Sequence, residues 1–230
     1  RFINGRGEHL TFGGQVMKNV AGYDVSRLLA GSWGTLGVIT EVSLKVLPVA
    51  PAEAFLMCQM SQAKALELLN QWGGQPLPLN ASCWVKDTSL PNAPEILFVR
   101  LRGAQAAVEA AKVRMSQDVA ALNSALIEQA HASVSQDWLD CADQRLPFFT
   151  QAAASPELAL WRLSVPQTAP VLNLPDTVSS PLIEWHGGQR WVWAPLSAAD
   201  ALRREAAAVG GQATLFKRPR QDSAATKVSV

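Results

Sequence analysis

Gly13 to Pro48 reads GGQVMKNVAGYDVSRLLAGSWGTLGVITEVSLKVLP, and this stretch decides how the first part of the chain folds. A short helix is expected after Asp24, because its carboxylate can accept hydrogen bonds from the free amides of a first helical turn. Gly31 is placed to end that helix, since glycine readily takes the left-handed conformation found just beyond helices. The apolar face of the helix is formed by Val25, Leu28 and Leu29.

An alternating pattern follows and predicts a strand that runs from Val38 to Val46. One face carries Val38, Thr40, Val42, Leu44 and Val46, and the other carries Glu41, Ser43 and Lys45. A period of two residues is typical of a strand with one buried and one solvated face. Pro48 closes the strand. At the front of the chain, residues 4–7 (NGRG) predict a hairpin turn that returns through residues 9–12.

Small residues join the expected helix to the expected strand. Gly34 and Gly37 flank the start of the strand, where bare backbone amides can lie against a phosphate or a flavin ring. For any single glycine, a tight turn without a ligand is the alternative interpretation.

The whole string resembles the late part of the flavin domain, the PCMH-type domain, of FAD-linked oxidases of the vanillyl-alcohol oxidase type. The resemblance is carried by Lys18, by Gly22-Tyr23-Asp24 and by residues 31–40 (GSWGTLGVIT). It implies FAD as the cofactor, held by Trp33, Gly34, Thr35, Leu36, Gly37, Val38 and Ile39. The family usually has glutamate where this chain has Trp33. A flavin contact made through the backbone survives that change, whereas one made through a carboxylate does not.

The composition excludes several classes of function. The 230 residues are 48% hydrophobic with a net charge of +1, which permits a packed core and argues against nucleic acid or an anionic membrane as the main partner. Cys58, Cys83 and Cys141 form no C-x-x-C motif, so we expect no metal site and reduced thiols in a cytoplasmic protein. The sequence has no apolar run of about 18 residues, so no membrane span is expected.

Residues 48–51 (PVAP) predict a stiff linker to a second domain. Strands are expected near 54–60, 81–86, 96–101, 158–165, 182–185, 190–194 and 213–216, and helices near 61–72, 104–126, 135–144 and 197–209, the last capped by Ser197. This order predicts an antiparallel α+β layer. In the resembled family the corresponding domain is a ferredoxin-like cap over the substrate side of the flavin.

The expected domains are residues 1–50, the C-terminal part of the FAD-binding domain, and residues 51–217, the cap or substrate domain. Residues 218–230 are expected to be a polar tail. Because the sequence enters a strand pattern without an initial methionine and ends in a polar run, we expect a fragment of a longer protein.

Two arginines inside cap strands are the candidate catalytic residues. Arg162 and Arg190 each lie among tryptophans, in the runs LWRL and RWVW. Either guanidinium can clamp a substrate carboxylate through two hydrogen bonds, and either can instead lie on a solvated face, stacked on a ring. Lys18 is a further cation on the flavin side. His186 follows Trp185 in a glycine turn, where a surface histidine is expected and a histidine facing the active site is the alternative.

The resemblance becomes narrower in the second domain, where residues 146–149 (LPFF), 160–166 (LWRLSVP) and 183–185 (IEW) are similar to the FAD-binding subunits of bacterial glycolate oxidase complexes. It implies an oxidoreductase subunit that passes a hydride from glycolate to flavin and yields glyoxylate. A larger flavin subunit and an iron–sulfur subunit are the implied partners. The implied location is cytoplasmic, with association to the inner membrane through those partners.

Two alternatives remain open. The larger oxidases of this superfamily carry a histidine-rich metal motif that this chain lacks, which favours a non-catalytic subunit that assembles the complex with a larger catalytic flavin subunit. A subunit acting on D-lactate or another 2-hydroxy acid is the second alternative.

Overall fold

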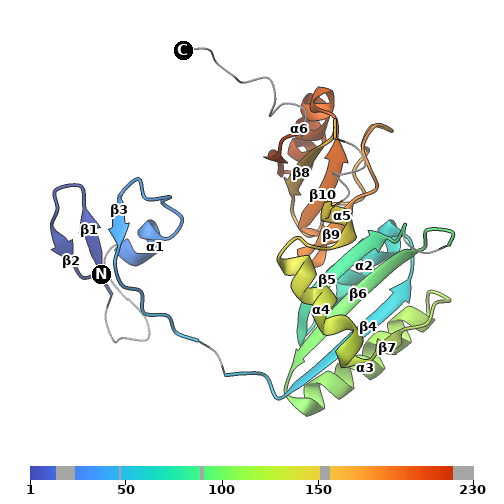
Figure 1. Cartoon of the computed structure of the whole chain (residues 1–230). Helices are drawn as coiled ribbons and strands as arrows, with labels where there is room; N and C mark the ends of the chain where they lie inside the picture. The colour runs from blue at the N-terminus through green and yellow to red at the C-terminus, as the bar shows by residue number, and fades with distance from the viewer. Residues whose placement is uncertain (14–23, 47, 89–90, 151–155, 220–230) are drawn as a thin grey trace. The chain divides into compact units, whose positions relative to one another are not determined.

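The structure is a computed structural model that describes residues 1–13, 24–46, 48–88, 91–150 and 156–219, with the side chains of 131–133 outside the description (Figure 1). The chain divides into two compact units, Arg1–Val49 and Ala50–Val230. Lys18, Gly22 and Tyr23 lie outside the described residues, as does most of the expected tail.

Unit 1 holds a three-stranded antiparallel sheet in the order β2-β1-β3. Its strands are β1 (Phe2–Asn4), β2 (His9–Leu10) and β3 (Gly37–Ile39). The predicted hairpin turn is confirmed: the side-chain oxygen of Asn4 accepts from the amides of Arg6 and Glu8, at 2.9 and 3.0 Å.

The short helix α1 (Val25–Leu29) is confirmed as well. Its Asp24 cap accepts from the amide of Arg27 at 3.1 Å. Leu29 is buried, and Gly31, two residues beyond the helix, has φ +80°. The local chemistry of this segment therefore sets its structure.

The predicted strand from Val38 to Val46 is wrong beyond Ile39. Residues 40–46 take no regular structure, and the side chains of Val42, Leu44 and Val46 are 61 to 79% exposed. A strand needs a neighbour that supplies hydrogen bonds, and β1 spans three residues. Before β1, the carbonyl of Arg1 accepts from the amide of Thr40 at 3.0 Å, and the α-amino group of Arg1 donates to the carbonyl of Glu41 at 2.7 Å.

Unit 2 is built on one eight-stranded antiparallel sheet in the order β11-β8-β10-β9-β5-β6-β4-β7 (Figure 1). The strands are β4 (Ala52–Gln59), β5 (Leu79–Lys86), β6 (Glu95–Gly103), β7 (Ile127–Gln129), β8 (Ala159–Ser164), β9 (Leu182–Glu184), β10 (Gln189–Ala194) and β11 (Gln212–Lys217). The chain is thus of the predicted α+β class.

One face of this sheet is covered by α2 (Gln62–Gly73), α3 (Gln105–Ala120) and α6 (Ala199–Ala208). The apolar side chains of the first two helices that pack on the sheet are buried: Ala65, Leu66, Leu69, Trp72, Val108, Ala111, Met115 and Val119. The expected Ser197 cap is wrong. A 3₁₀ turn, η3 (Leu196–Ala198), precedes α6, so that Ala198 takes the cap position.

The opposite face is covered by α4 (His131–Ala142) and α5 (Pro147–Thr150) (Figure 1). The helix expected to reach residue 126 ends at Ala120, because the chain turns there and residues 127–129 pair with β4. Between β9 and β10 the chain makes a tight turn, η2 (Trp185–Gly187). Among the described helices, each is too short or too polar to cross a lipid bilayer.

Candidate functional site

In unit 1, the glycine-rich segment between α1 and β3 forms a tight left-handed turn. Trp33 and Gly34 have φ values of +55° and +75°. The carbonyl of Ser32 accepts from both the amide and the hydroxyl of Thr35, at 3.0 and 2.6 Å. The turn thus presents backbone at the start of β3.

The two glycines of this turn are needed for different reasons. A Cβ on Gly37 would lie 2.2 Å from the carbonyl oxygen of Ile3 and 2.5 Å from the ring of Phe2. Gly37 is therefore required by the packing of β3 on β1. A Cβ on Gly34 would meet no atom within 4 Å, so Gly34 is required only by its φ value and faces open space.

Large apolar side chains surround this backbone. Trp33 is 95% exposed, and Leu36, Val38 and Ile39 are also exposed. Exposed apolar side chains in a group mark a binding surface more often than scattered ones do. A flat apolar ring with a polar edge, such as a flavin, fits this combination of apolar side chains and open backbone.

In unit 2, Arg190 has a structural role that the sequence did not reveal. Its side chain is buried, and its Nε donates to the carbonyl of Gly187 at 3.1 Å. Its Nη1 and Nη2 donate to the carbonyls of Pro170 and Ala169, each at 2.6 Å. Burial lowers the pKa of Arg190 to about 10, which leaves it protonated at neutral pH. All three nitrogens are engaged by the backbone, so we do not propose Arg190 as the substrate clamp.

Arg162 lies on the other face of the sheet, beside Trp191 of β10. It is half-buried, and its guanidinium carbon lies 5.9 Å from the ring centre of Phe216. Its Nε is buried without a hydrogen-bond partner among the described residues. The contact with Phe216 matches the alternative in which this arginine stacks on an aromatic ring. The role of Arg162 as a clamp for the substrate carboxylate remains a prediction.

His186 is half-buried, where a surface histidine was expected. Its backbone amide and its Nδ1 both contact the hydroxyl oxygen of Ser82, each at 3.0 Å. Burial lowers the pKa of His186 below its ordinary value of 6.5. Its ring is therefore neutral at physiological pH.

His186, Ser82 and Arg100 line a cavity of about 320 Å³, called the Arg100 cavity here, together with Trp138 of α4 and Glu184 of β9. These residues come from positions up to 104 apart in sequence and meet because β9 pairs only with Cys83 and Trp84 of β5. Beside Ser82 the turn η2 takes the place of the next strand. No local pattern in the sequence marks Ser82 or Arg100, which lie on the neighbouring strands β5 and β6, where Ser82 pairs with Val99 and Arg100 with Ala81.

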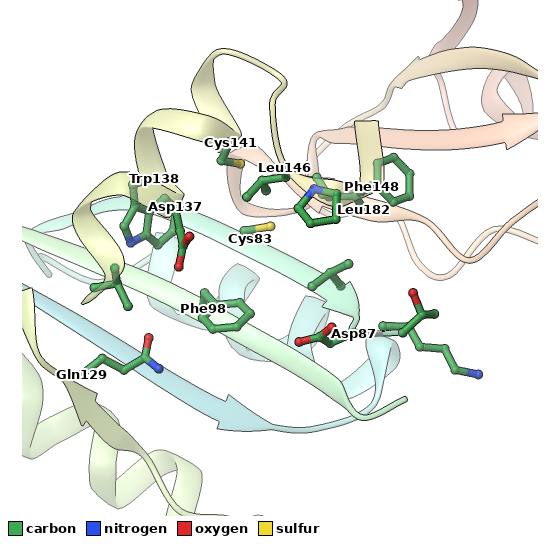
Figure 2. Close-up of a pocket in the computed structure, with 15 residues that line it drawn as sticks. Cys83, Asp87, Phe98, Gln129, Asp137, Trp138, Cys141, Leu146, Phe148 and Leu182 are labelled. Carbon is green, nitrogen blue, oxygen red and sulfur yellow. The ribbon is translucent and has the colours of Figure 1, made fainter. Parts of the chain in front are cut away.

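A second cavity, of about 310 Å³, lies between the sheet and α4 and is called the Cys83 cavity (Figure 2). Its walls are mostly apolar and aromatic: Cys83, Val85, Phe98, Val134, Trp138, Cys141, Leu146, Pro147, Phe148 and Leu182. Figure 2 shows Asp87 and Asp137 directed into this space. Lys86 lines the same cavity, so its charged groups are two carboxylates and one ammonium.

The thiol of Cys141, which lines the Cys83 cavity, is held in its protonated form. The contact with Cys83 and burial raise the pKa of Cys141, whose thiol donates to Glu184 Oε1 at 3.2 Å. A thiol kept protonated is a weak nucleophile. This fits the expected reduced, buried cysteines.

The similarity to known proteins extends over most of the chain. No protein-family model matches it. Over 216 residues, 94% of the chain, it is 38% identical to the glycolate oxidase subunit GlcE of Escherichia coli (strain K12), of which it covers 53%.

Shorter segments are similar to related enzymes. Over 42 residues, 18% of the chain, it is 50% identical to the glycolate oxidase subunit GlcD of Bacillus subtilis (strain 168), of which it covers 9%. Over 47 residues, 20% of the chain, it is 43% identical to the mitochondrial D-lactate dehydrogenase (cytochrome) of Arabidopsis thaliana, of which it covers 8%. The chain thus spans about half the length of GlcE and under a tenth of these two other relatives.

Proposed function

We propose that this chain is part of an FAD-binding subunit of a 2-hydroxyacid oxidase complex, with glycolate as the substrate and glyoxylate as the product. The observation that carries the proposal is the 38% identity over 94% of the chain to a protein named as a glycolate oxidase subunit. The similarity of a shorter segment to D-lactate dehydrogenase supports the wider class, enzymes that oxidise 2-hydroxy acids.

The turn at the start of β3 is the proposed flavin contact in unit 1. Trp33 and Leu36 would pack on the ring together with Val38 or Ile39, whose side chains point to opposite faces of β3, and the backbone at Gly34 would lie against the polar edge of the ring. When bound, FAD supplies the acceptor for the hydride that leaves the alcohol carbon of the substrate. The residues of this chain contribute binding, orientation and exclusion of water.

Unit 2 is the proposed substrate domain, the ferredoxin-like cap of the resembled family. An antiparallel sheet with helices on its faces supports this assignment. By the same reasoning, residues 1–50 close the PCMH-type FAD domain. A larger flavin subunit similar to GlcD is a proposed partner, because GlcD and GlcE are both named as glycolate oxidase subunits. An iron–sulfur subunit is a further proposed partner, which only the family resemblance implies.

A specific observation also favours the assembly role as second candidate. Arg190 is one of the two predicted clamps for the substrate carboxylate, and its three guanidinium nitrogens donate to three backbone carbonyls instead. A subunit that keeps the fold while a larger partner performs the chemistry would not need Arg190 to bind substrate.

One experiment separates these readings. The full-length protein containing this chain is purified alone and with its partners, and its FAD content and the loss of visible flavin absorbance on adding glycolate, D-lactate or 2-hydroxyglutarate are measured. Flavin that binds the isolated subunit and is reduced by glycolate supports the catalytic role. Flavin that is reduced only in the complex supports the assembly role, and a full-length subunit that binds no FAD overturns the proposal.

A further inference from the structure

The turn η2 holds two consecutive residues other than glycine in a left-handed conformation. Trp185 and His186 have φ values of +53° and +54°, and Gly187 follows at +100°. Such a conformation costs about 1–3 kcal/mol per residue and persists only where the surroundings impose it. Strain of this kind is concentrated at functional sites.

The surroundings of η2 do impose it. Gln167 Nε2 donates to the carbonyl of Trp185 at 3.2 Å, and Arg190 Nε donates to the carbonyl of Gly187 at 3.1 Å. The amide of His186 donates to Ser82 Oγ at 3.0 Å. The turn is thus tied to three separate segments, and together they fix the position of the His186 ring.

Ser82 also selects the tautomer of His186. Its oxygen accepts from the backbone amide of His186, and its own proton needs an acceptor because the residue is buried. Among the described residues, His186 Nδ1 at 3.0 Å is that acceptor. The neutral ring then carries its proton on Nε2, the ring nitrogen that Ser82 leaves available to a ligand.

Arg100 supplies the cation of the same cavity. In the described part of the chain both polar contacts of its guanidinium involve Nε, at 2.8 Å to Asn80 Oδ1 and 3.6 Å to Glu53 Oε1. Nη1 and Nη2 therefore remain for a ligand. The guanidinium carbon lies 5.4 Å from the ring centre of Trp138, which restricts its orientation.

Glu184 is the carboxylate that lines this cavity, and three donors already solvate its charge. Trp191 Nε1 and Gln189 Nε2 donate to its Oε2 at 2.6 and 3.1 Å, and Cys141 donates to its Oε1 at 3.2 Å. Its remaining demand for a cation is therefore small, and the carboxylate that pairs with Arg100 is that of Glu53, at 3.6 Å from Nε.

We propose that the Arg100 cavity binds a small organic carboxylate, with Arg100 Nη1 and Nη2 on the carboxylate and His186 Nε2–H as a neutral donor to an oxygen of the same molecule. The assignment of that molecule as a 2-hydroxy acid rests on the proposed function, whereas the anion site rests on the geometry of unit 2. His186 is a ligand-binding residue in this account, and Ser82 is a positioning residue.

The test measures binding of glycolate to the full-length protein by titration calorimetry, with ethylene glycol as the analogue that lacks the carboxylate. Arg100→Gln should weaken glycolate binding about 10- to 100-fold, because it removes a charged two-point contact. His186→Asn should weaken it about 3- to 10-fold, since asparagine tolerates the left-handed conformation but lacks the ring donor. Ethylene glycol should not bind.

Arg203→Gln is the matched control, because Arg203 also stacks on a tryptophan, with its guanidinium carbon 5.8 Å from the ring centre of Trp161, but belongs to α6 on the opposite face. It should keep the wild-type Kd. Arg100→Lys retains the charge and should bind with intermediate affinity, and it replaces Arg100→Gln if that variant does not fold.

FAD content is measured on the same samples, which separates this inference from the proposed function. A protein that binds FAD and glycolate normally with Arg100→Gln and His186→Asn would refute the anion site and leave the proposed function standing. A protein without FAD whose glycolate affinity depends on Arg100 would refute the proposed function and support the anion site. An equal loss of glycolate affinity in Arg203→Gln would also refute the anion site.

Discussion

Arg190 donates from its Nε to the carbonyl oxygen of Gly187, three residues earlier in the chain, across 3.1 Å. A buried arginine in the middle of a strand therefore holds the turn that carries His186. Its other two nitrogens bind the carbonyls of Ala169 and Pro170, so one side chain connects two loops. This explains a buried cation without a carboxylate partner among the hydrogen bonds of its guanidinium.

Replacement of Arg190 by methionine should destabilise the protein. Methionine preserves much of the apolar stem but leaves three carbonyls without donors, and we expect the free energy of unfolding to fall by about 2–3 kcal/mol. Urea unfolding of the full-length protein measures the change. Arg162→Met is the comparison, because its Nε has no hydrogen-bond partner among the described residues, and its loss should be below about 1 kcal/mol. Equal losses for the two variants would contradict the structural role of Arg190.

The two glycines of the turn between α1 and β3 should respond differently to alanine. Gly37→Ala places a Cβ against the Ile3 carbonyl, so unit 1 should unfold more easily and FAD should be lost as a consequence. Gly34→Ala meets no atom and costs about 1–2 kcal/mol through its φ value alone. We expect Gly34→Ala to fold and to bind FAD more weakly. FAD content and proteolysis of the full-length protein distinguish the two, and normal FAD content in Gly34→Ala would show that the turn has no ligand.

The parts of this fold that could be predicted are those whose cause is local. Asp24 lies three residues before the amide that it caps. Ala65, Leu66, Leu69 and Trp72 recur at helical spacing. In both cases the residues that cause the structure lie within one short segment, so the segment alone predicts it. The strand predicted to Val46 failed because alternation indicates two faces but not the presence of a neighbour. The neighbour β1 provides pairing only for residues 37–39.

The candidate site was largely beyond prediction for the same reason. Ser82 and His186 are separated by 104 residues, and they meet because β5 pairs with β9 in one register. Arg190 and Arg162 looked alike in sequence, since each follows or precedes a tryptophan in a strand. Their roles differ because Arg190 lies on the face of α2 and α6, close to two loops, and Arg162 lies on the other face.

Gly187 should be the glycine of η2 that cannot be replaced. A Cβ there would lie 2.9 Å from Leu66 Cδ2 and 3.1 Å from the carbonyl oxygen of Gln167, and its φ is +100°. Gly187→Ala should lower the free energy of unfolding by about 1–3 kcal/mol and weaken glycolate binding, because the His186 ring moves. Gly188→Ala, with φ −78° and contacts of 3.3 Å or more, should cost below about 1 kcal/mol. Urea unfolding and calorimetry of both variants check this, and equal effects would count against a strained turn.

The stability of the folded protein should depend on pH through His186. Burial lowers the pKa of His186 below 6.5, so the folded protein keeps this ring neutral while the unfolded chain takes up a proton as the pH falls below 6.5. The unfolded state then binds more protons, and the free energy of unfolding decreases as the pH falls through the window below 6.5. Above that window the contribution of His186 is fully present. The other charged groups that line the cavity are Arg100 and Glu184.

His186→Asn should therefore flatten the curve of unfolding free energy between about pH 5 and pH 7, because asparagine takes up no proton. Urea unfolding at steps across this range measures the curve for the full-length protein and the variant. His9→Asn removes an exposed imidazole from unit 1 and serves as the control for the loss of a histidine. If the His186→Asn curve is also parallel to the wild type, the ring is not held neutral by the fold, and the assignment of Nε2–H as a donor to the ligand loses its basis.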